Sequence, residues 1–327
     1  MFVQILILLS SLMVLVWSAD KFVYGASSLA RNLGISPMII GLTIVAMGSS
    51  APEMMIATTA SLDGRVDTAV GNALGSNITN IALVLGITAL MHPLSVSSTT
   101  VKREIPLILA ITALAYFMLA DHHFSFVEGL ILIIGFAAYI ISLLVITLRR
   151  SKQQNQEDAL IVEAEHEVPE ATTTKNSVVW LVVGMVLLPV SAHYLVGSSV
   201  WIAQAFGISD LVIGLTVIAI GTSLPELAAS IMSIIKKEDD LAIGNIIGSN
   251  IFNILAVLSL AGLIAPGDID HNVALRDAPY MLAVTLFLFF LCFTRRLGNF
   301  SITRLKGFAL LLTFVSYQIL LFSQLKS

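Results

Sequence analysis

Residues 41–53 read GLTIVAMGSSAPE, and residues 214–226 read GLTVIAIGTSLPE. Each stretch begins with a mostly apolar run that is followed by two hydroxyl residues. One apolar residue, a proline and a glutamate then complete the motif. The two glutamates, Glu53 and Glu226, lie 173 positions apart. A pattern this specific that occurs twice at a fixed separation indicates an internal repeat.

A second pair of segments keeps the same separation. Residues 71–80 read GNALGSNITN, and residues 244–253 read GNIIGSNIFN. Over the longer windows 38–81 and 211–254, 19 of 44 aligned residues are identical without a gap. The two halves of the chain are therefore expected to share one fold.

The composition places both halves in a membrane. Of the 327 residues, 57% are hydrophobic and only 12% are charged, and the mean hydropathy is +0.93. Soluble domains carry about 25% charged residues. The net charge of −4 argues against nucleic-acid binding, and the single cysteine, Cys292, excludes a disulfide framework. The apolar runs are long and lack strand-like alternation, which predicts an all-α polytopic membrane protein.

Ten transmembrane helices are predicted, because a helix needs about 20 mostly apolar residues to cross a bilayer. The predicted spans are 2–24, 37–62, 69–91, 105–121, 126–148, 177–204, 210–235, 241–264, 277–294 and 306–323. They divide into a first five-helix repeat at 1–148, a polar linker at 149–176 and a second five-helix repeat at 177–327.

Lysine and arginine residues predict the orientation of these spans. With both termini external, 13 of these residues fall in cytoplasmic loops and 3 fall in external loops. The linker 149–176 is then cytoplasmic. Five spans per half is an odd number, so the halves insert in opposite directions, and Arg103 lies inside while its repeat partner Arg276 lies outside. Inverted-topology repeats are typical of secondary transporters.

Glu53 and Glu226 are expected to converge in the interior of the bundle. A carboxylate at the centre of a membrane helix costs about 2.5–3.5 kcal/mol on insertion scales, and such residues usually face the interior. Two of them carry a charge of −2, which a bound divalent cation or two monovalent cations compensate. The alternative is a pair of structural carboxyls that bond backbone groups freed by Pro52 and Pro225.

The repeated segments also supply neutral oxygen atoms, which are the ligands that Ca²⁺ and Na⁺ prefer. The predicted ligands beside the glutamates are the backbone oxygens of Ala46 and Ala219 and the hydroxyls of Ser49, Ser50, Thr222 and Ser223. The second motif adds Ser76, Asn80, Ser249 and Asn253. The alternatives are hydroxyls bonded to their own helix and asparagines that hold helices together, the latter weighed evenly for Asn72 and Asn245.

The other polar motifs predict no chemistry. No nucleophile elbow, HExxH, CxxC, GxGxxG or P-loop occurs, so neither an enzyme nor a cofactor is expected, and no protein partner is predicted. Residues 121–123, Asp-His-His, are interpreted as a solvated turn in an external loop. His193 is the repeat partner of Asp20 and is expected to be packed or hydrogen-bonded.

With its paired Pro-Glu and Gly-Ser-Asn motifs, the sequence resembles the cation/calcium exchanger superfamily, most closely its bacterial sodium/calcium antiporters. The resemblance covers nearly the whole chain and implies ten helices in two inverted repeats. It implies that Glu53 and Glu226 bind Ca²⁺ centrally and that the hydroxyl and backbone oxygens complete the calcium and sodium sites. The first and sixth helices would slide as the gate. Some members carry aspartate where this chain has Asn253, which leaves two carboxylates rather than three.

The function that follows is antiport of Ca²⁺ against Na⁺ by alternating access, in a bacterial cytoplasmic membrane. A cation/H⁺ exchanger, in which the glutamates carry protons, is the first alternative. A cation channel is the second, although one inverted pair of motifs around a shared site fits a carrier better.

Overall fold

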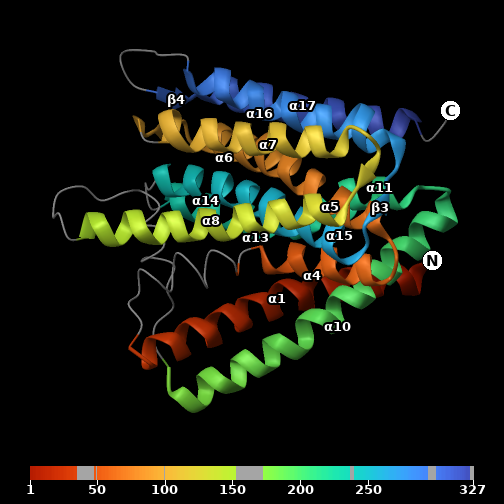
Figure 1. The fold of residues 1–327 in the computed structure, drawn as a ribbon, viewed down its shortest axis with the longest axis horizontal. Coiled ribbons are helices and arrows are strands. Elements are labelled where there is room, and N and C mark those ends of the chain that lie inside the picture. Colours follow the sequence, from red (N-terminus) through yellow and green to blue (C-terminus); the bar gives the residue numbers. More distant parts are fainter. Residues whose placement is uncertain are drawn as a thin grey trace.

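The structure is a computed structural model that describes residues 1–34, 48, 50–98, 100–151, 172–235, 239–293 and 300–324. It is a bundle of helices, shown in Figure 1. The first half contains α1 (Phe2–Asn32), α4 (Ala51–Leu62), α5 (Val66–Ile78), α6 (Leu85–Met91), α7 (Ile105–Leu119) and α8 (Phe126–Ser151). The second half contains α10 (Thr174–Phe206), α11 (Asp210–Ile213), α12 (Ala219–Thr222), α13 (Leu224–Ile235), α14 (Asp239–Phe252), α15 (Ser259–Ile264), α16 (Ala278–Phe293) and α17 (Arg304–Gln324).

Within these described residues, eight helical segments are long and apolar enough to cross a membrane. Two of the ten predicted spans are not among them. The span 37–62 begins at residues outside the described part, and α7 has only 15 residues of α-helix, although a π-helical turn precedes it. The all-helical membrane character predicted from composition is therefore confirmed for eight spans.

The helices form layers, with α1 and α10 side by side at one edge of the bundle and α16 and α17 at the opposite edge (Figure 1). The spans Val66–Met91 and Ala242–Ile264 are the most enclosed, with 78% and 83% of their apolar windows buried. The corresponding share in α1 and α10 is 28%. The two copies of the Gly-Asn-x-x-Gly-Ser-Asn motif thus lie on the central helices.

Glycines allow the central helices to touch backbone to backbone. A Cβ atom on Gly71 of α5 would lie 2.7 Å from the carbonyl oxygen of Leu211, and one on Gly214 would lie 2.7 Å from the carbonyl oxygen of Thr68. Small residues at membrane helix crossings permit this approach. The crossing holds the first Gly-Ser-Asn motif beside the helix that leads to Glu226.

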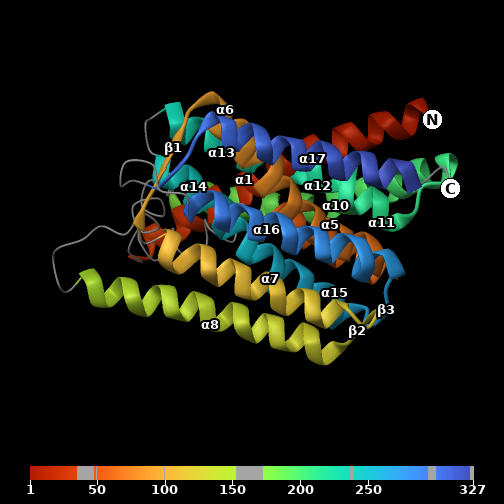
Figure 2. The ribbon, with the colours of Figure 1, turned by 90° about the horizontal axis from the view of Figure 1, so that it is seen from above.

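Two short antiparallel strand pairs join the halves at opposite ends of the bundle. Strand β1 (Leu94–Val96) pairs with β4 (Phe300–Ile302), and β2 (His123–Phe124) pairs with β3 (Gly267–Asp268). Figures 1 and 2 show the start of α1 and the end of α17 at the end that carries β2 and β3. The end of α8 and the start of α10, which flank the linker, lie at the other end.

Among the described residues, five π-helical turns interrupt the α-helices, and four of them are related by the repeat. Thr100–Glu104 matches Val273–Asp277 at an offset of 173 residues, and Thr79–Val84 overlaps Asn253–Leu258 at nearly the same offset. The fifth is Gly214–Ile218. Such turns are frequent at functional sites, and two of them begin at or next to the predicted ligands Asn80 and Asn253.

Candidate functional site

Each glutamate of the repeated motif lies in the first turn of a helix that begins inside the bundle. Ser50 is the N-cap of α4, where Pro52 and Glu53 follow within the first turn. In the second half the helix is interrupted at Ser223, between α12 and α13. Proline suits this position because the first-turn donors have no intrahelical partner. The positive end of the helix dipole also favours a carboxylate there.

The predicted ligands that the structure describes are all buried. Glu53 is fully buried and Glu226 is 1% exposed. The other buried members are Ser50, Ser76, Asn80, Ala219, Thr222, Ser223, Ser249 and Asn253. Ser49 and Ala46 lie outside the described residues. No carboxylate of this set can reach bulk water without movement of the surrounding helices.

Contacts across the halves bring these side chains together. The Ser76 hydroxyl lies 3.4 Å from the Thr222 hydroxyl, which joins the first-half motif to the second. The Ser249 hydroxyl donates to Oε1 of Glu226 at 3.4 Å. The charge of Glu226 and the polar side chain of Thr222 both act on the Glu53 carboxylate. The two repeats therefore contribute to one polar cluster rather than to two separate ones.

Several polar atoms of this cluster have no hydrogen-bond partner among the described residues. They are both carboxylate oxygens of Glu53, the hydroxyls of Ser50 and Ser223, and both amide atoms of Asn80 and of Asn253. An unsatisfied buried polar group costs about 1–3 kcal/mol, and more when it is charged. Buried oxygen atoms without a partner are of the kind that hard cations coordinate.

The donor set favours hard cations. The described residues contain no group of three or more His, Cys, Asp or Glu side chains that could hold a metal ion. The cluster instead offers two carboxylates with hydroxyl and amide oxygens. Oxygen-only sets suit Ca²⁺ and Na⁺, whereas zinc, copper and iron sites normally use histidine or cysteine.

Two predicted neutral ligands make hydrogen bonds of their own in this structure. The Ala219 carbonyl oxygen accepts from the Ser223 backbone at 3.1 Å and from the Thr222 hydroxyl at 3.4 Å. Asn72, left open between two roles, donates from its amide to the Glu53 carbonyl oxygen at 3.2 Å. Asn72 therefore holds α5 against α4 and positions the glutamate.

Two buried asparagines of the second motif, Asn77 and Asn250, were not predicted from the sequence. Asn77 donates to the sulfur of Met281 at 3.6 Å, and neither amide atom of Asn250 has a partner among the described residues. They are repeat partners, and each directly follows the serine of Gly-Ser-Asn. Their matching positions in the two Gly-Ser-Asn motifs are the sequence signal that could have identified them as candidate buried polar residues.

A buried ion pair in the π-helical turn before α16 was also missed. Arg276 Nε lies 2.7 Å from Oδ1 of Asp277, which also accepts from the Tyr317 hydroxyl of α17 at 2.8 Å. Asp277 is fully buried. Its repeat partner Glu104 is 7% exposed, so a buried acid recurs at this position in both halves. From the sequence, Arg276 served only to predict orientation.

The histidines that the structure describes lie outside the polar cluster. His193 is 65% exposed, its Nδ1 lies 3.8 Å from Oδ2 of Asp63, and its ring contacts that of Tyr194 edge-on at 5.9 Å. His123 hydrogen-bonds Asp268 at 2.8 Å, and the His122 and His271 rings lie 4.1 Å apart. The predicted solvated turn at 121–123 is thus partly ordered by pairing with β3.

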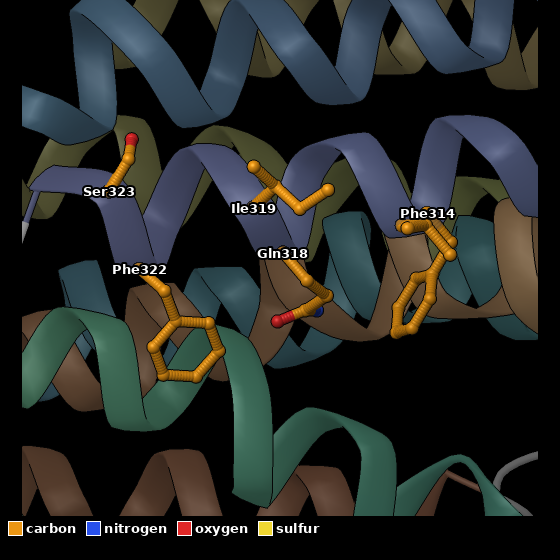
Figure 3. Close-up of a pocket in the computed structure, with 6 residues that line it drawn as sticks. Phe314, Gln318, Ile319, Phe322 and Ser323 are labelled. Atoms are coloured by element: carbon orange, nitrogen blue, oxygen red, sulfur yellow. The ribbon is translucent and has the colours of Figure 1, made fainter.

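Two hollows are lined by residues that the structure describes, and one of these two approaches the helix starts that carry the glutamates. The first, of 1060 Å³, runs along α1 and is also lined by Pro52 and Pro225. The second, of 570 Å³, lies on α17, where Phe314, Gln318 and Phe322 point to the same side of the helix (Figure 3). Its lining is apolar apart from Gln318 and Ser323, so it offers no charged ligand.

Comparison with known proteins agrees with this chemistry. The family model described as sodium/calcium exchanger protein matches residues 3–145 and 176–323. A protein of Alkalimonas amylolytica named as an antiporter, CaxA, is 56% identical over 324 residues, which cover 99% of this chain and 100% of that protein. The matched segments flank the linker, so both halves contribute to the likeness.

Two further proteins extend the likeness. The inner membrane protein YrbG of Escherichia coli is 43% identical over 289 residues, 88% of each chain. A solved structure of the sodium-calcium exchanger NCX_Mj, soaked with Na⁺ and Sr²⁺, superposes with a TM-score of 0.61. It is 29% identical, and the match covers 96% of this chain and 97% of that one.

Proposed function

The chain belongs to the family of sodium/calcium exchanger proteins, and on this premise we propose that it exchanges Ca²⁺ for Na⁺ by alternating access. It is an integral membrane transporter and not an enzyme, since its relatives are exchangers and antiporters. Glu53 and Glu226 bind the cation near the midplane in this proposal. The observation that carries it is the buried polar cluster around these two carboxylates, with both oxygens of Glu53 unpartnered among the described residues.

Charge balance gives the mechanism. The empty site with both carboxylates ionised has a charge of −2, which one Ca²⁺ or two Na⁺ neutralise. A net charge is costly to enclose in a medium of low dielectric constant, so the helices occlude the site only when it is loaded. The carrier then changes sides only when it is loaded. If it carries Ca²⁺ in one direction and Na⁺ in the other, the result is antiport.

The remaining ligands are assigned by their place in the cluster. We assign the hydroxyl, amide and backbone oxygens of Ser49, Ser50, Ser76, Asn80, Thr222, Ser223, Ser249, Asn253, Ala46 and Ala219 to the calcium and sodium sites. The cross-repeat contact between Ser76 and Thr222 supports a single shared site. Unpartnered amides on Asn80 and Asn253 support a place for additional ions beside the glutamates.

The architecture in this proposal is ten transmembrane helices in two inverted repeats, 1–148 and 177–327, joined by the linker 149–176. The strand pairs support it, because each joins a loop of one half to a loop of the other at opposite ends of the bundle. The repeated π-helical turns support the duplication. The loop charges and the name of YrbG support an inner membrane, external termini and a cytoplasmic linker.

A cation/H⁺ exchanger is the second candidate. The observation that favours it is Asn253, which leaves the described cluster with two carboxylates. Two buried carboxylates can also be neutralised by two protons, so Ca²⁺ against two H⁺ is electrically balanced in the same site.

Flux into proteoliposomes distinguishes the two. Purified protein is reconstituted, and ⁴⁵Ca²⁺ uptake is measured with an outward Na⁺ gradient at equal pH, or with a pH gradient without Na⁺. Uptake driven by the Na⁺ gradient and saturable in Ca²⁺ is expected. Uptake driven only by the pH gradient would replace the proposal with the second candidate. Uptake without a counter-ion would indicate a channel and overturn both.

A further inference from the structure

The hollow along α1 is an apolar groove with one charged end. One face of α1, from Leu9 to Tyr24, forms its long wall, and Pro52 and Pro225 form part of the other side. The α1 side chains are apolar up to Trp17, and then Asp20 and Lys21 follow. Lys21 Nζ lies 2.8 Å from Oδ2 of Asp20, and the two side chains are 29% and 66% exposed. A groove of 1060 Å³ thus ends at an accessible pair of opposite charges.

The tryptophans place this charged pair at the membrane interface. All three tryptophans of the chain, Trp17, Trp180 and Trp201, lie on α1 and α10. Trp180 and Trp201 are separated on α10 by about 31 Å at 1.5 Å per residue. That separation matches a hydrocarbon core about 30 Å thick, and tryptophans favour its two boundaries.

The groove therefore starts at the level of lipid head groups and extends into the hydrocarbon layer. The Trp17 and Trp180 rings lie 6.1 Å apart, and Lys21 Nζ lies 5.6 Å from the centre of the Trp180 ring. These contacts fix Asp20 and Lys21 at the Trp180 boundary. The apolar part of the groove, beside Leu9 and Leu12, then lies at the depth of acyl chains.

We propose that this groove binds one zwitterionic phospholipid that carries a primary amine, a phosphatidylethanolamine. Its phosphate meets the Lys21 ammonium and its amine meets the Asp20 carboxylate, so the ion pair within the protein and the one within the head group are exchanged for two ion pairs between protein and lipid. One acyl chain lies along α1 against Pro52 and Pro225. The head group of phosphatidylglycerol offers no cation to Asp20, and the quaternary amine of phosphatidylcholine donates no hydrogen bond.

The site borders the cation cluster without belonging to it. Pro52 and Pro225 directly precede Glu53 and Glu226, so an acyl chain in the groove packs against the two helix starts that present the carboxylates. The hollow on α17 provides a contrast within the same molecule. It is apolar, but its polar side chains, Gln318 and Ser323, are uncharged and give no basis for head-group preference.

Tryptophan fluorescence tests the proposal without any ion flux, so its failure is separate from failure of the antiport proposal. The full chain carrying Trp201→Phe retains Trp17 and Trp180 beside the groove. It is reconstituted in phosphatidylcholine vesicles to which one brominated lipid is added in increasing fractions. The added lipid is phosphatidylethanolamine, phosphatidylglycerol or phosphatidylcholine, in each case with brominated acyl chains. Brominated phosphatidylethanolamine is expected to reach half-maximal quenching at about a fivefold lower fraction than the other two.

Variants identify the contacts. Lys21→Gln and Asp20→Asn should each reduce the advantage of phosphatidylethanolamine to about the level of phosphatidylcholine. Lys175→Gln, an exposed lysine at the start of α10, is the matched control and should keep the advantage. Equal half-maximal fractions for the three lipids overturn the proposal. An advantage that survives both Lys21→Gln and Asp20→Asn also overturns it.

Discussion

At the scale of single residues, Glu53 and Glu226 are equivalent by sequence but differ in their hydrogen bonds. Ser249 donates to the Glu226 carboxylate, whereas neither carboxylate oxygen of Glu53 has a hydrogen-bond partner among the described residues. Asn72 donates to the backbone oxygen of Glu53 and leaves its side chain available. The two glutamates are thus held by different hydrogen bonds, although both are buried.

Neutralising either glutamate should remove Ca²⁺ exchange. In Glu53→Gln or Glu226→Gln the site keeps one negative charge, and bound Ca²⁺ leaves a net charge of +1 in a buried position. Loss of one carboxylate charge at about 4 Å from a divalent cation, with an effective dielectric constant near 20, costs about 8 kcal/mol. Calcium exchange should therefore fall by at least about three orders of magnitude. Binding of one Na⁺, which stays balanced, should fall less.

The measurement is ⁴⁵Ca²⁺ flux together with binding calorimetry on each purified variant. Glu128→Gln is the matched control, because Glu128 bonds the Ser125 backbone and hydroxyl at the start of α8 and a glutamine retains such capping. Its exchange should stay near that of the unmodified protein. Near-normal calcium exchange in either site variant would assign the glutamates a structural role.

At the scale of elements, α5 can cross the helix that contains Gly214 so closely because glycine has no Cβ atom. Gly71→Ala places a Cβ atom 2.7 Å from a backbone oxygen that cannot move by itself, so the helices must separate. We expect a loss of about 1–3 kcal/mol in stability. Thermal unfolding of the purified protein, followed by tryptophan fluorescence, measures this as a lower Tm.

Gly197 of α10 is the matched control for this substitution, since a Cβ atom added there would have no neighbour within 4 Å. Gly197→Ala adds a better helix former without a clash and should leave the Tm unchanged or raise it by up to the equivalent of about 1 kcal/mol. If both alanine variants had the same Tm, close packing at the α5 crossing would not limit stability.

The β2–β3 pair should respond to pH. The hydrogen bond to Asp268 raises the pKa of His123 above its usual value, with weaker contributions from Asp121 and Glu128. The folded pKa is the higher one, so the stabilisation is complete below the unfolded pKa of about 6.5 and is lost as pH rises through the folded pKa. NMR titration with labelled histidine measures this pKa. Asp268→Asn should lower it, and an unchanged value would contradict the assigned cause.

Much of this arrangement was predictable from the sequence, for reasons that particular residues make clear. Proline before each glutamate predicts a break in the helix, and α13 does begin next to Pro225. Apolar runs predict the spans because burial in lipid requires them. The Asp277–Tyr317 hydrogen bond was not predictable, since its partners are 40 residues apart and neither residue has a local pattern. The pairing of β1 with β4 likewise depends on how distant loops meet.

At the scale of the whole molecule, the orientation in the membrane remains a prediction that reporters can test. A periplasmic reporter fused to the C-terminus should be active, and a cytoplasmic reporter inserted within 152–171 should be active. The physical reason is the excess of lysine and arginine in the loops assigned to the cytoplasm. A cytoplasmic C-terminus would contradict the predicted orientation of the whole bundle, because the start of α1 and the end of α17 lie at the same end (Figure 1).

The two strand pairs have a consequence for how the molecule is held together. Each pair links one half to the other, one at each end of the bundle, and the crossing at Gly71 links them in the middle. The two halves therefore contact each other at both ends and in the middle of the bundle, and none of these three contacts involves the linker. If the chain were cut between residues 151 and 172, the two halves would associate as a heterodimer through these contacts. The intact linker contributes mainly by keeping each half at a high effective concentration near the other.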